Sequence, residues 1–155
     1  MPGNTWGLVY GTIAIGALLA AEAANTETYL ETIAGVVLAL IIYWMAHAYS
    51  EFTAERLDRG EPLKIGAFAR VMMREVSVLV GAAIPLLALV VFGIGGASLS
   101  TAVNAAIWTS AAMILVIELV AGVRADLSGT DLVKQSVLGA LLGFLMIALK
   151  LVLHG

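Results

Sequence analysis

Five stretches of this chain are apolar over lengths that match the thickness of a lipid bilayer. The hydrocarbon core of a membrane is about 30 Å thick, and a helix needs roughly 17–25 apolar residues to cross it. Ala, Leu, Val, Ile and Gly dominate the stretches, and the alternation of apolar and polar residues that marks a porin strand is missing. The sequence therefore predicts an all-α integral membrane protein, a bundle of five transmembrane helices forming one domain over residues 1–155. The expected spans are 7–24, 29–49, 71–93, 100–123 and 132–153.

Composition agrees with a membrane setting and excludes several kinds of chemistry. Of the 155 residues, 61% are hydrophobic and only 12% are charged, whereas a soluble domain is nearer a quarter charged. The chain has no cysteine, which excludes disulfides, thiolate metal sites and cysteine nucleophiles. Nucleotide-binding loops and the familiar hydrolase motifs are missing. The basic residues flank the spans instead of forming a free-standing patch, so we expect the lipid bilayer as partner and no nucleic acid.

The lysines and arginines predict how the chain is oriented in the cell membrane. Seven of the eight lie between spans two and three or between spans four and five, and only Lys150 lies near the opposite end. Because cytoplasmic loops are enriched in Lys and Arg, we expect a cytoplasmic N-terminus and an external C-terminus. No basic residue precedes the first span, so we expect that span to remain in the mature protein. The second helix should continue to residue 59, past the membrane, because no breaker interrupts it.

Two ionisable side chains interrupt the apolar stretches near their cytoplasmic ends. His47 lies in the second span and Glu118 in the fourth. A charge inside a bilayer is costly unless it is paired, neutralised or hydrated, so such residues are candidates for a functional site. We expect them to form a proton or cation pathway together with three further polar residues, which are Asn104, Glu51 and Glu75.

Each of the two residues also has a purely structural interpretation. His47 could be a buried histidine that donates to a carbonyl, or an interfacial ring, instead of a proton relay or metal ligand. Tyr43, His47 and Glu51 are four residues apart and share one stripe of a helix, which would put two metal ligands side by side. The sequence names no cofactor, but it leaves room for a divalent metal held by His47, Glu51 and Glu118.

Glu118 has no cation within one helical turn, so it must be protonated, hydrated or paired across helices. The expected partners in the pairing interpretation are Arg74, Lys134 and Arg124. We expect a second pair, Glu22 with Lys150, at the outer edge, with both chains reaching for water as the alternative.

Small residues and one proline predict how the helices pack. Gly7 and Gly11 in the first span, and Gly139 and Gly143 in the fifth, are spaced so that two helix backbones can approach closely. Packing within one chain is the simpler interpretation, and self-association is the alternative. Pro85 removes one backbone donor from the third span, and we expect it to kink that helix.

The segment from Trp44 to Glu51 (WMAHAYSE), followed by the charged helix end from Glu55 to Arg59 (ERLDR), resembles small uncharacterised multi-span membrane proteins of actinobacteria. The resemblance covers the second span and its exit from the membrane. It implies a family and a membrane setting, and it draws attention to His47, but it implies no activity.

Three functions are compatible with these observations. The first is a small membrane transport protein, an oligomeric proton or cation channel or transporter, because five spans alone leave little room for a path. The second is a non-catalytic assembly or lipid-binding subunit in which the polar residues lock helices together. The third is a metal-binding membrane enzyme. No catalytic residues can be assigned, so we expect transport ahead of catalysis, and the sequence does not name the transported species.

Overall fold

The computed structural model describes residues 5–21, 28–60, 62, 64–126 and 128–154. Within these residues every regular element is an α-helix, which confirms the predicted all-α class. Four of the helices are long and apolar enough to cross a membrane, and α1 is a shorter apolar helix of 17 residues. The helices are α1 (Thr5–Ala21), α2 (Tyr29–Arg59), α3 (Ile65–Arg74), α4 (Ser77–Ile94), α5 (Leu99–Arg124) and α6 (Gly129–His154).

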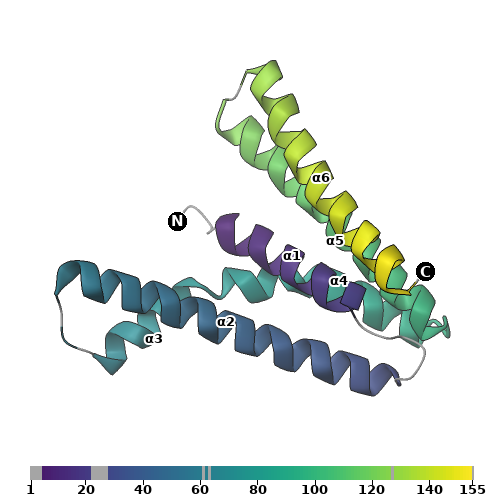
Figure 1. Ribbon diagram of the computed structural model, residues 1–155, viewed down its shortest axis with the longest axis horizontal. Helices are drawn as coiled ribbons and strands as arrows, with labels where there is room; N and C mark the ends of the chain where they lie inside the picture. Colours follow the sequence, from purple (N-terminus) through teal and green to yellow (C-terminus); the bar gives the residue numbers. More distant parts are fainter. Residues whose placement is uncertain (1–4, 22–27, 61, 63, 127, 155) are drawn as a thin grey trace.

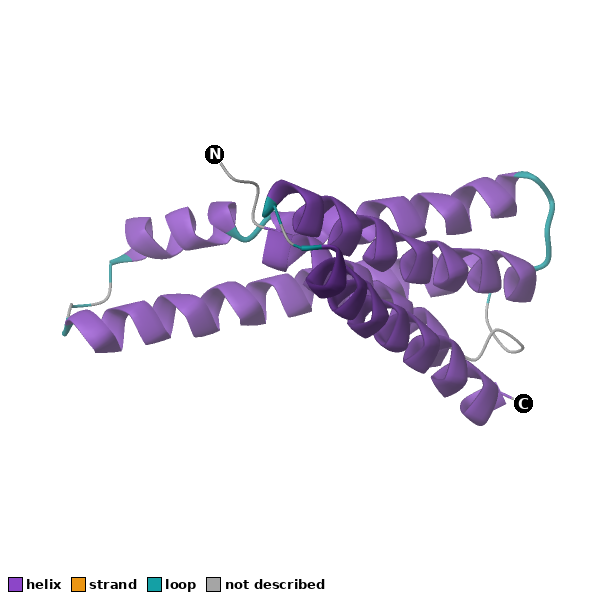
Figure 2. Cartoon of the chain, turned by 90° about the horizontal axis from the view of Figure 1, so that it is seen from above, coloured by secondary structure: helices purple, strands orange, loops and turns teal. Residues whose placement is uncertain are grey.

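The helices form two hairpins that splay apart from a common centre. Figure 1 shows the α5–α6 hairpin diverging from α2 and α3, with α1 and α4 lying between them. Figure 2, seen from above, shows that α3 and the end of α2 project beyond the other helices. We call α3, the turn at Glu75 and Val76, and residues 44–59 of α2 the α2–α3 arm. The molecule is therefore more open than the five-helix bundle that the sequence suggests.

The centre of the molecule is a contact between the backbones of α1 and α4. A Cβ atom added at Gly11 would lie 1.8 Å from the carbonyl oxygen of Val78, and one added at Gly81 would lie 2.1 Å from that of Leu8. Only glycine allows helices to approach this closely. Around this contact lies an apolar core built from α1, α2, α4 and α5. Gly7 lies on the same face of α1, against Ser77.

The carbonyl that Pro85 leaves without its usual donor is satisfied by α1. In a regular helix, the oxygen of Gly81 would accept from the backbone N–H of residue 85, which proline lacks. The buried hydroxyl of Thr12 lies 2.9 Å from this oxygen and 2.8 Å from that of Leu8, its own turn. α4 runs from Ser77 to Ile94 with Pro85 inside it. The proline therefore provides a hydrogen-bonding site for its neighbour.

The expected third span, residues 71–93, is wrong at its start. Residues 71–74 belong to α3, the chain turns at Glu75 and Val76, and α4 begins at Ser77. At the break the N–H groups of Val78 and Leu79 bond three residues back, to Glu75 and Val76. The indole of Trp44, on α2, donates to the carbonyl of Met72 at 3.2 Å. No glycine or proline marks this break in the sequence, and the side chain that bonds to it comes from another helix.

The α2–α3 arm has a small core of its own. Ala48, Phe52 and Val71 are buried there, and the rings of Phe52 and Phe68 meet edge to face at 5.4 Å. α2 has 31 residues, so at about 1.5 Å per residue it extends about 46 Å, well beyond a hydrocarbon core of about 30 Å. Its helical bounds are those expected from the sequence, 29 to 59.

Candidate functional site

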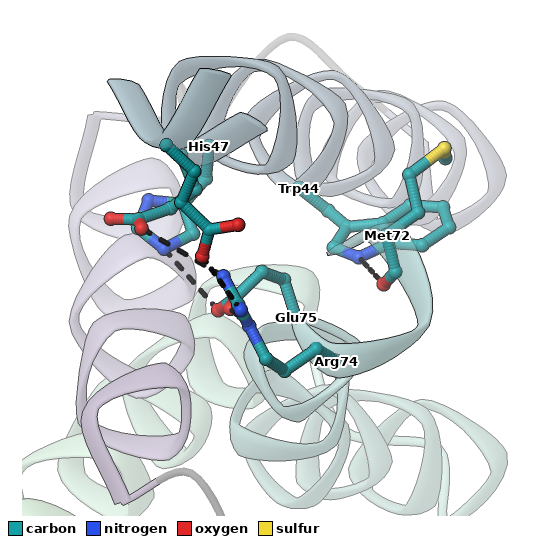
Figure 3. Close-up of polar contacts among 7 residues, drawn as sticks. Trp44, His47, Met72, Arg74 and Glu75 are labelled. Atoms are coloured by element: carbon teal, nitrogen blue, oxygen red, sulfur yellow. Dashed lines mark hydrogen bonds and ion pairs between the residues drawn. The ribbon is translucent and has the colours of Figure 1, made fainter. Parts of the chain in front are cut away.

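The break between α3 and α4 places a buried carboxylate between two basic side chains. Glu75 is only 4% exposed. Its Oε2 atom lies 3.4 Å from Nε2 of His47, and its Oε1 atom accepts from Nε of Arg74 at 3.0 Å. Figure 3 shows Glu75 between His47, which comes from α2, and Arg74, which ends α3. The structure thus brings together a histidine and a glutamate that are 28 positions apart in the sequence.

Arg74 extends this contact into a network that carries an excess of negative charge. Its Nη1 atom donates to Glu55 at 2.8 Å, and its Nη2 atom lies 3.9 Å from Glu51. The hydrogen bonds to Glu55 and then to Glu75 raise the pKa of Arg74 above its ordinary value, so the guanidinium stays charged. Three carboxylates therefore surround one permanent cation. A proton on His47, or a bound cation, would reduce the remaining negative charge.

Aromatic side chains hold the imidazole from the other side. The ring of Tyr10, on α1, stacks on His47 with centroids 5.2 Å apart and an interplanar angle of 22°. Tyr43, one turn before His47 on α2, meets Tyr10 edge to face at 6.5 Å. His47 is half-buried, with 31% of its side chain exposed. Three elements therefore meet at this ring: α1, α2 and the turn between α3 and α4.

Local sequence explains why charges are tolerated at the break. Arg74 is the last residue of α3 and Glu75 comes just before α4. The C-terminal end of a helix favours a cation and the N-terminal end favours an anion, so both residues suit the helix dipoles that meet there. His47 and Glu51 of the stripe on α2 face this turn and contact Glu75 and Arg74, whereas Tyr43 contacts Tyr10 of α1.

Glu118 forms a separate site on the α5–α6 hairpin. Its Oε2 atom accepts from Nε2 of Gln135 at 2.5 Å, and a Cβ atom at Gly139 would lie 3.0 Å from its side chain. Its expected partners Arg74, Lys134 and Arg124 are not found beside it. Lys134 lies on the exposed side of α6 and contacts Asp131 at 3.3 Å, whereas the next residue, Gln135, faces α5. A cavity of about 310 Å³ adjoins the pair, and the described residues that line it are Thr5, Val9, Glu118, Ala121 and Gln135.

The remaining candidate residues lie apart from these two sites. Asn104 is exposed on α5 and Gly143 packs against Ala111. Lys150 is partly buried, and its Nζ atom has no hydrogen-bond partner within the described residues. Glu22 lies outside the described residues, so the pair of Glu22 with Lys150 stays a prediction.

A groove runs along α1 from the histidine site. Its volume is about 350 Å³, and it lies between α1 and α2, with Tyr10 and Tyr43 at one end and Ala21 at the other. The other lining residues are small or aliphatic and recur every three or four positions, namely Ile13, Ala14, Ala17 and Leu18. This face of α1 is therefore only partly covered over most of the length of the helix.

Several residues of the site have no sequence pattern that identifies them as part of it. Tyr10 lies in a different span from His47, and Gln135 is only one polar residue near the start of the last span. Glu55 looks like half of an exposed intrahelical pair with Arg59, but the structure joins it to Arg74. For metal binding, the described residues contain no group of three or more His, Cys, Asp or Glu side chains. His47 and Glu51 lie in the network above, whereas Glu118 pairs elsewhere with Gln135.

Comparison of the whole chain with protein-family profiles, curated proteins and solved structures gave no match. The resemblance to actinobacterial membrane proteins therefore stays a prediction.

Proposed function

We propose that the protein is a small, oligomeric membrane transport protein that moves protons or cations, with the His47 and Glu75 pair as its exchanging group. The observation that carries this proposal is the 3.4 Å contact between His47 and the buried Glu75. The ring nitrogen of His47 and the carboxylate of Glu75 are groups that can bind a proton or a cation, and the structure holds them side by side. Arg74 fixes one oxygen of Glu75 and leaves the other for the histidine.

We propose further that α1 crosses the membrane as a fifth span, with the N-terminus in the cytoplasm and the C-terminus outside. At about 1.5 Å per residue, its 17 described residues extend about 25 Å, slightly less than a hydrocarbon core. The asymmetry of Lys and Arg supports this orientation, which places the His47 network at the cytoplasmic side. The chain has no cysteine, so single cysteines can report topology. A cysteine at Asp58 should be labelled only from the cytoplasm, and one at Ser100 only from outside.

The route would run along the groove between α1 and α2. The core of the chain is apolar, and its buried hydroxyls of Thr12 and Ser110 donate to backbone carbonyls of the same chain. The groove begins at Tyr10, which stacks on His47, and reaches Ala21 near the other end of α1. One side of the groove is open, so we propose that a second copy completes it. Asn104, exposed on α5, is then available to an oligomer interface.

Flux measurements in proteoliposomes test the proposal. Wild-type protein should carry protons or an alkali cation across a panel of pH values and cations, and His47→Phe and Glu75→Gln should abolish this flux. Phenylalanine keeps an aromatic ring against Tyr10 but cannot bind a proton. Tyr49→Phe is the control, because Tyr49 lies on the same helix, is exposed and does not line the groove, so this variant should conduct normally. Equal flux in wild type and His47→Phe, or none in wild type at any condition, would refute the proposal.

Substitutions of Glu118 test whether the second site takes part in transport. We propose that it exchanges protons or cations with the cytoplasm as a second group, beside the cavity near Thr5 and Val9. Its partner is an amide instead of a charged group, so Glu118→Gln keeps a hydrogen-bonding side chain there. We expect this variant to lower the flux less than Glu75→Gln does. Undiminished flux in Glu118→Ala would remove Glu118 from the pathway.

A second candidate function is a non-catalytic assembly or lipid-binding subunit. The observation in its favour is that His47, Glu75 and Glu118 all have partners within the chain. Under this alternative the networks only hold helices together. Wild-type protein would then give no flux, while His47→Phe and Glu75→Gln would lower the stability of the folded chain. The metal-enzyme alternative has no comparable observation among the described residues, and metal analysis of purified protein tests it.

A further inference from the structure

The α2–α3 arm contains a cavity that the transport proposal does not use. It lies between the end of α2 and α3, and its volume is about 310 Å³. It is lined by apolar side chains at its base and by charged side chains around them. The described lining residues are Phe52, Glu55, Arg56, Arg59, Pro62, Ala67, Arg70, Val71 and Arg74.

The charges around this cavity are unbalanced. Four of the described lining residues are arginines and one is acidic. Glu55, the acidic residue, is already bonded to Arg74. Arg70 uses its Nε atom to donate to the carbonyl of Gly66, which leaves its terminal nitrogens free for a ligand. Arg56 and Arg59 have no ion pair within the described part of the chain. Among the described residues, three guanidinium groups therefore border one cavity without an ion pair.

The chemistry of guanidinium identifies the ligand class. Its planar set of donors matches the oxygens of a phosphate group and binds them in pairs. The base of the cavity, formed by buried Phe52 and Val71, lowers the local dielectric constant and strengthens such contacts. Like charges that line one cavity repel one another, so an anion that bridges them also relieves that repulsion. A carboxylate ligand would meet the same charges, but phosphate offers more oxygens to three separate arginines.

We infer that this cavity binds a phosphate-bearing anion through Arg56, Arg59 and Arg70. The ligand is either the headgroup of an anionic phospholipid or a soluble phosphate. The arm continues a membrane-crossing helix, and Ile65 and Met73 are 80% and 72% exposed on α3, which suits a site close to a lipid surface. The inference does not depend on the transport proposal, because His47 and Glu75 do not line this cavity.

Binding to the purified full chain in a neutral detergent tests the inference. The probes are short-chain phosphatidylglycerol, short-chain phosphatidylcholine and inorganic phosphate, measured by native mass spectrometry and calorimetry. The test variant is the triple substitution Arg56→Gln, Arg59→Gln and Arg70→Gln. Arg124→Gln is the matched control, because Arg124 is also exposed at a helix end but does not line the cavity. Loss of these charge-assisted bonds should weaken binding at least about tenfold in the triple variant and leave the control unchanged.

Each outcome has a defined meaning. Preference for phosphatidylglycerol over phosphatidylcholine that disappears in the triple variant assigns the site to a lipid headgroup. Binding of inorganic phosphate that disappears in the same way assigns it to a soluble phosphate. Equal binding by wild type and triple variant, or no binding of either anionic probe, overturns the inference. If the triple variant does not fold, the single variants Arg59→Gln and Arg70→Gln replace it, and each must weaken binding for the inference to stand.

Discussion

The α1–α4 contact and the α2–α3 arm are held together by different means. At the first, Gly11 and Gly81 bring two backbones together with no space for even a methyl group. At the second, charged and aromatic side chains bridge α2 to the turn around Glu75. Backbone contacts have one geometry, whereas side-chain networks can rearrange when a proton or ion binds. We therefore regard the α1–α4 contact as the fixed part of the molecule and the arm as the responsive part.

Of the substitutions considered, Gly11→Ala is expected to lower the free energy of unfolding the most. The added Cβ would lie 1.8 Å from the oxygen of Val78, so α1 and α4 must separate. Overpacking of this kind costs about 2–3 kcal/mol. Gly35→Ala is the matched control, because Gly35 also lies inside a helix and nothing lies within 4 Å of its added Cβ. Unfolding in mixed detergent micelles measures both variants, and equal stability would show that the contact is not fixed.

The next effect is expected from Glu75→Gln, which tests the arm. The substitution removes the carboxylate that contacts His47 and leaves Arg74 with Glu55 and the more distant Glu51. Breaking a fully buried ion pair costs about 3–5 kcal/mol of stability. Because Arg74 is half exposed and keeps its contact with Glu55, we expect a smaller loss of about 2 kcal/mol in the free energy of unfolding. Glu51→Gln is the control within the same network. Its contact with Arg74 is 3.9 Å long and exposed, and such pairs contribute about 0–1 kcal/mol.

A smaller loss of stability is expected from Thr12→Val, which removes a hydrogen bond across the α1–α4 contact. The variant leaves the oxygen of Gly81 without its donor, at a cost of about 1 kcal/mol. Pro85→Ala should rescue it, because alanine restores the N–H that proline lacks. A double-mutant cycle measures this coupling. Additive effects of the two substitutions would mean that Thr12 does not substitute for the missing donor.

The smallest loss of stability is expected from Trp44→Phe in the arm. Phenylalanine keeps a ring but loses the donor to the carbonyl of Met72, which should cost about 0.5–1 kcal/mol. Hydrogen exchange of the residues around Glu75 should rise in this variant more than at α1. Trp108→Phe is the control, because Trp108 is 62% exposed on α5. Unchanged exchange near Glu75 would show that Trp44 does not stabilise the break.

The candidate site could be predicted in part. His47, Glu51 and Glu75 were identified from the sequence because ionisable groups are conspicuous beside hydrocarbon, and the stripe from Tyr43 to Glu51 follows from helical spacing. Their partners could not be identified in this way. Whether His47 meets Glu75 or Glu118 depends on which helices are neighbours, and both glutamates lie at a similar expected depth. The break at Glu75 was missed because its stabilising donor, Trp44, comes from another helix.

The sequence by itself determined that the chain is helical and suited to a membrane, because hydrophobicity and the run lengths of apolar residues are local properties. It also determined which residues are chemically unusual. Only the tertiary structure decided that the helices form two splayed hairpins and that Gln135, not a basic residue, bonds to Glu118. It also decided that four arginines line one cavity of the arm. These features depend on contacts between residues far apart in the chain, and helical periodicity does not specify which faces meet.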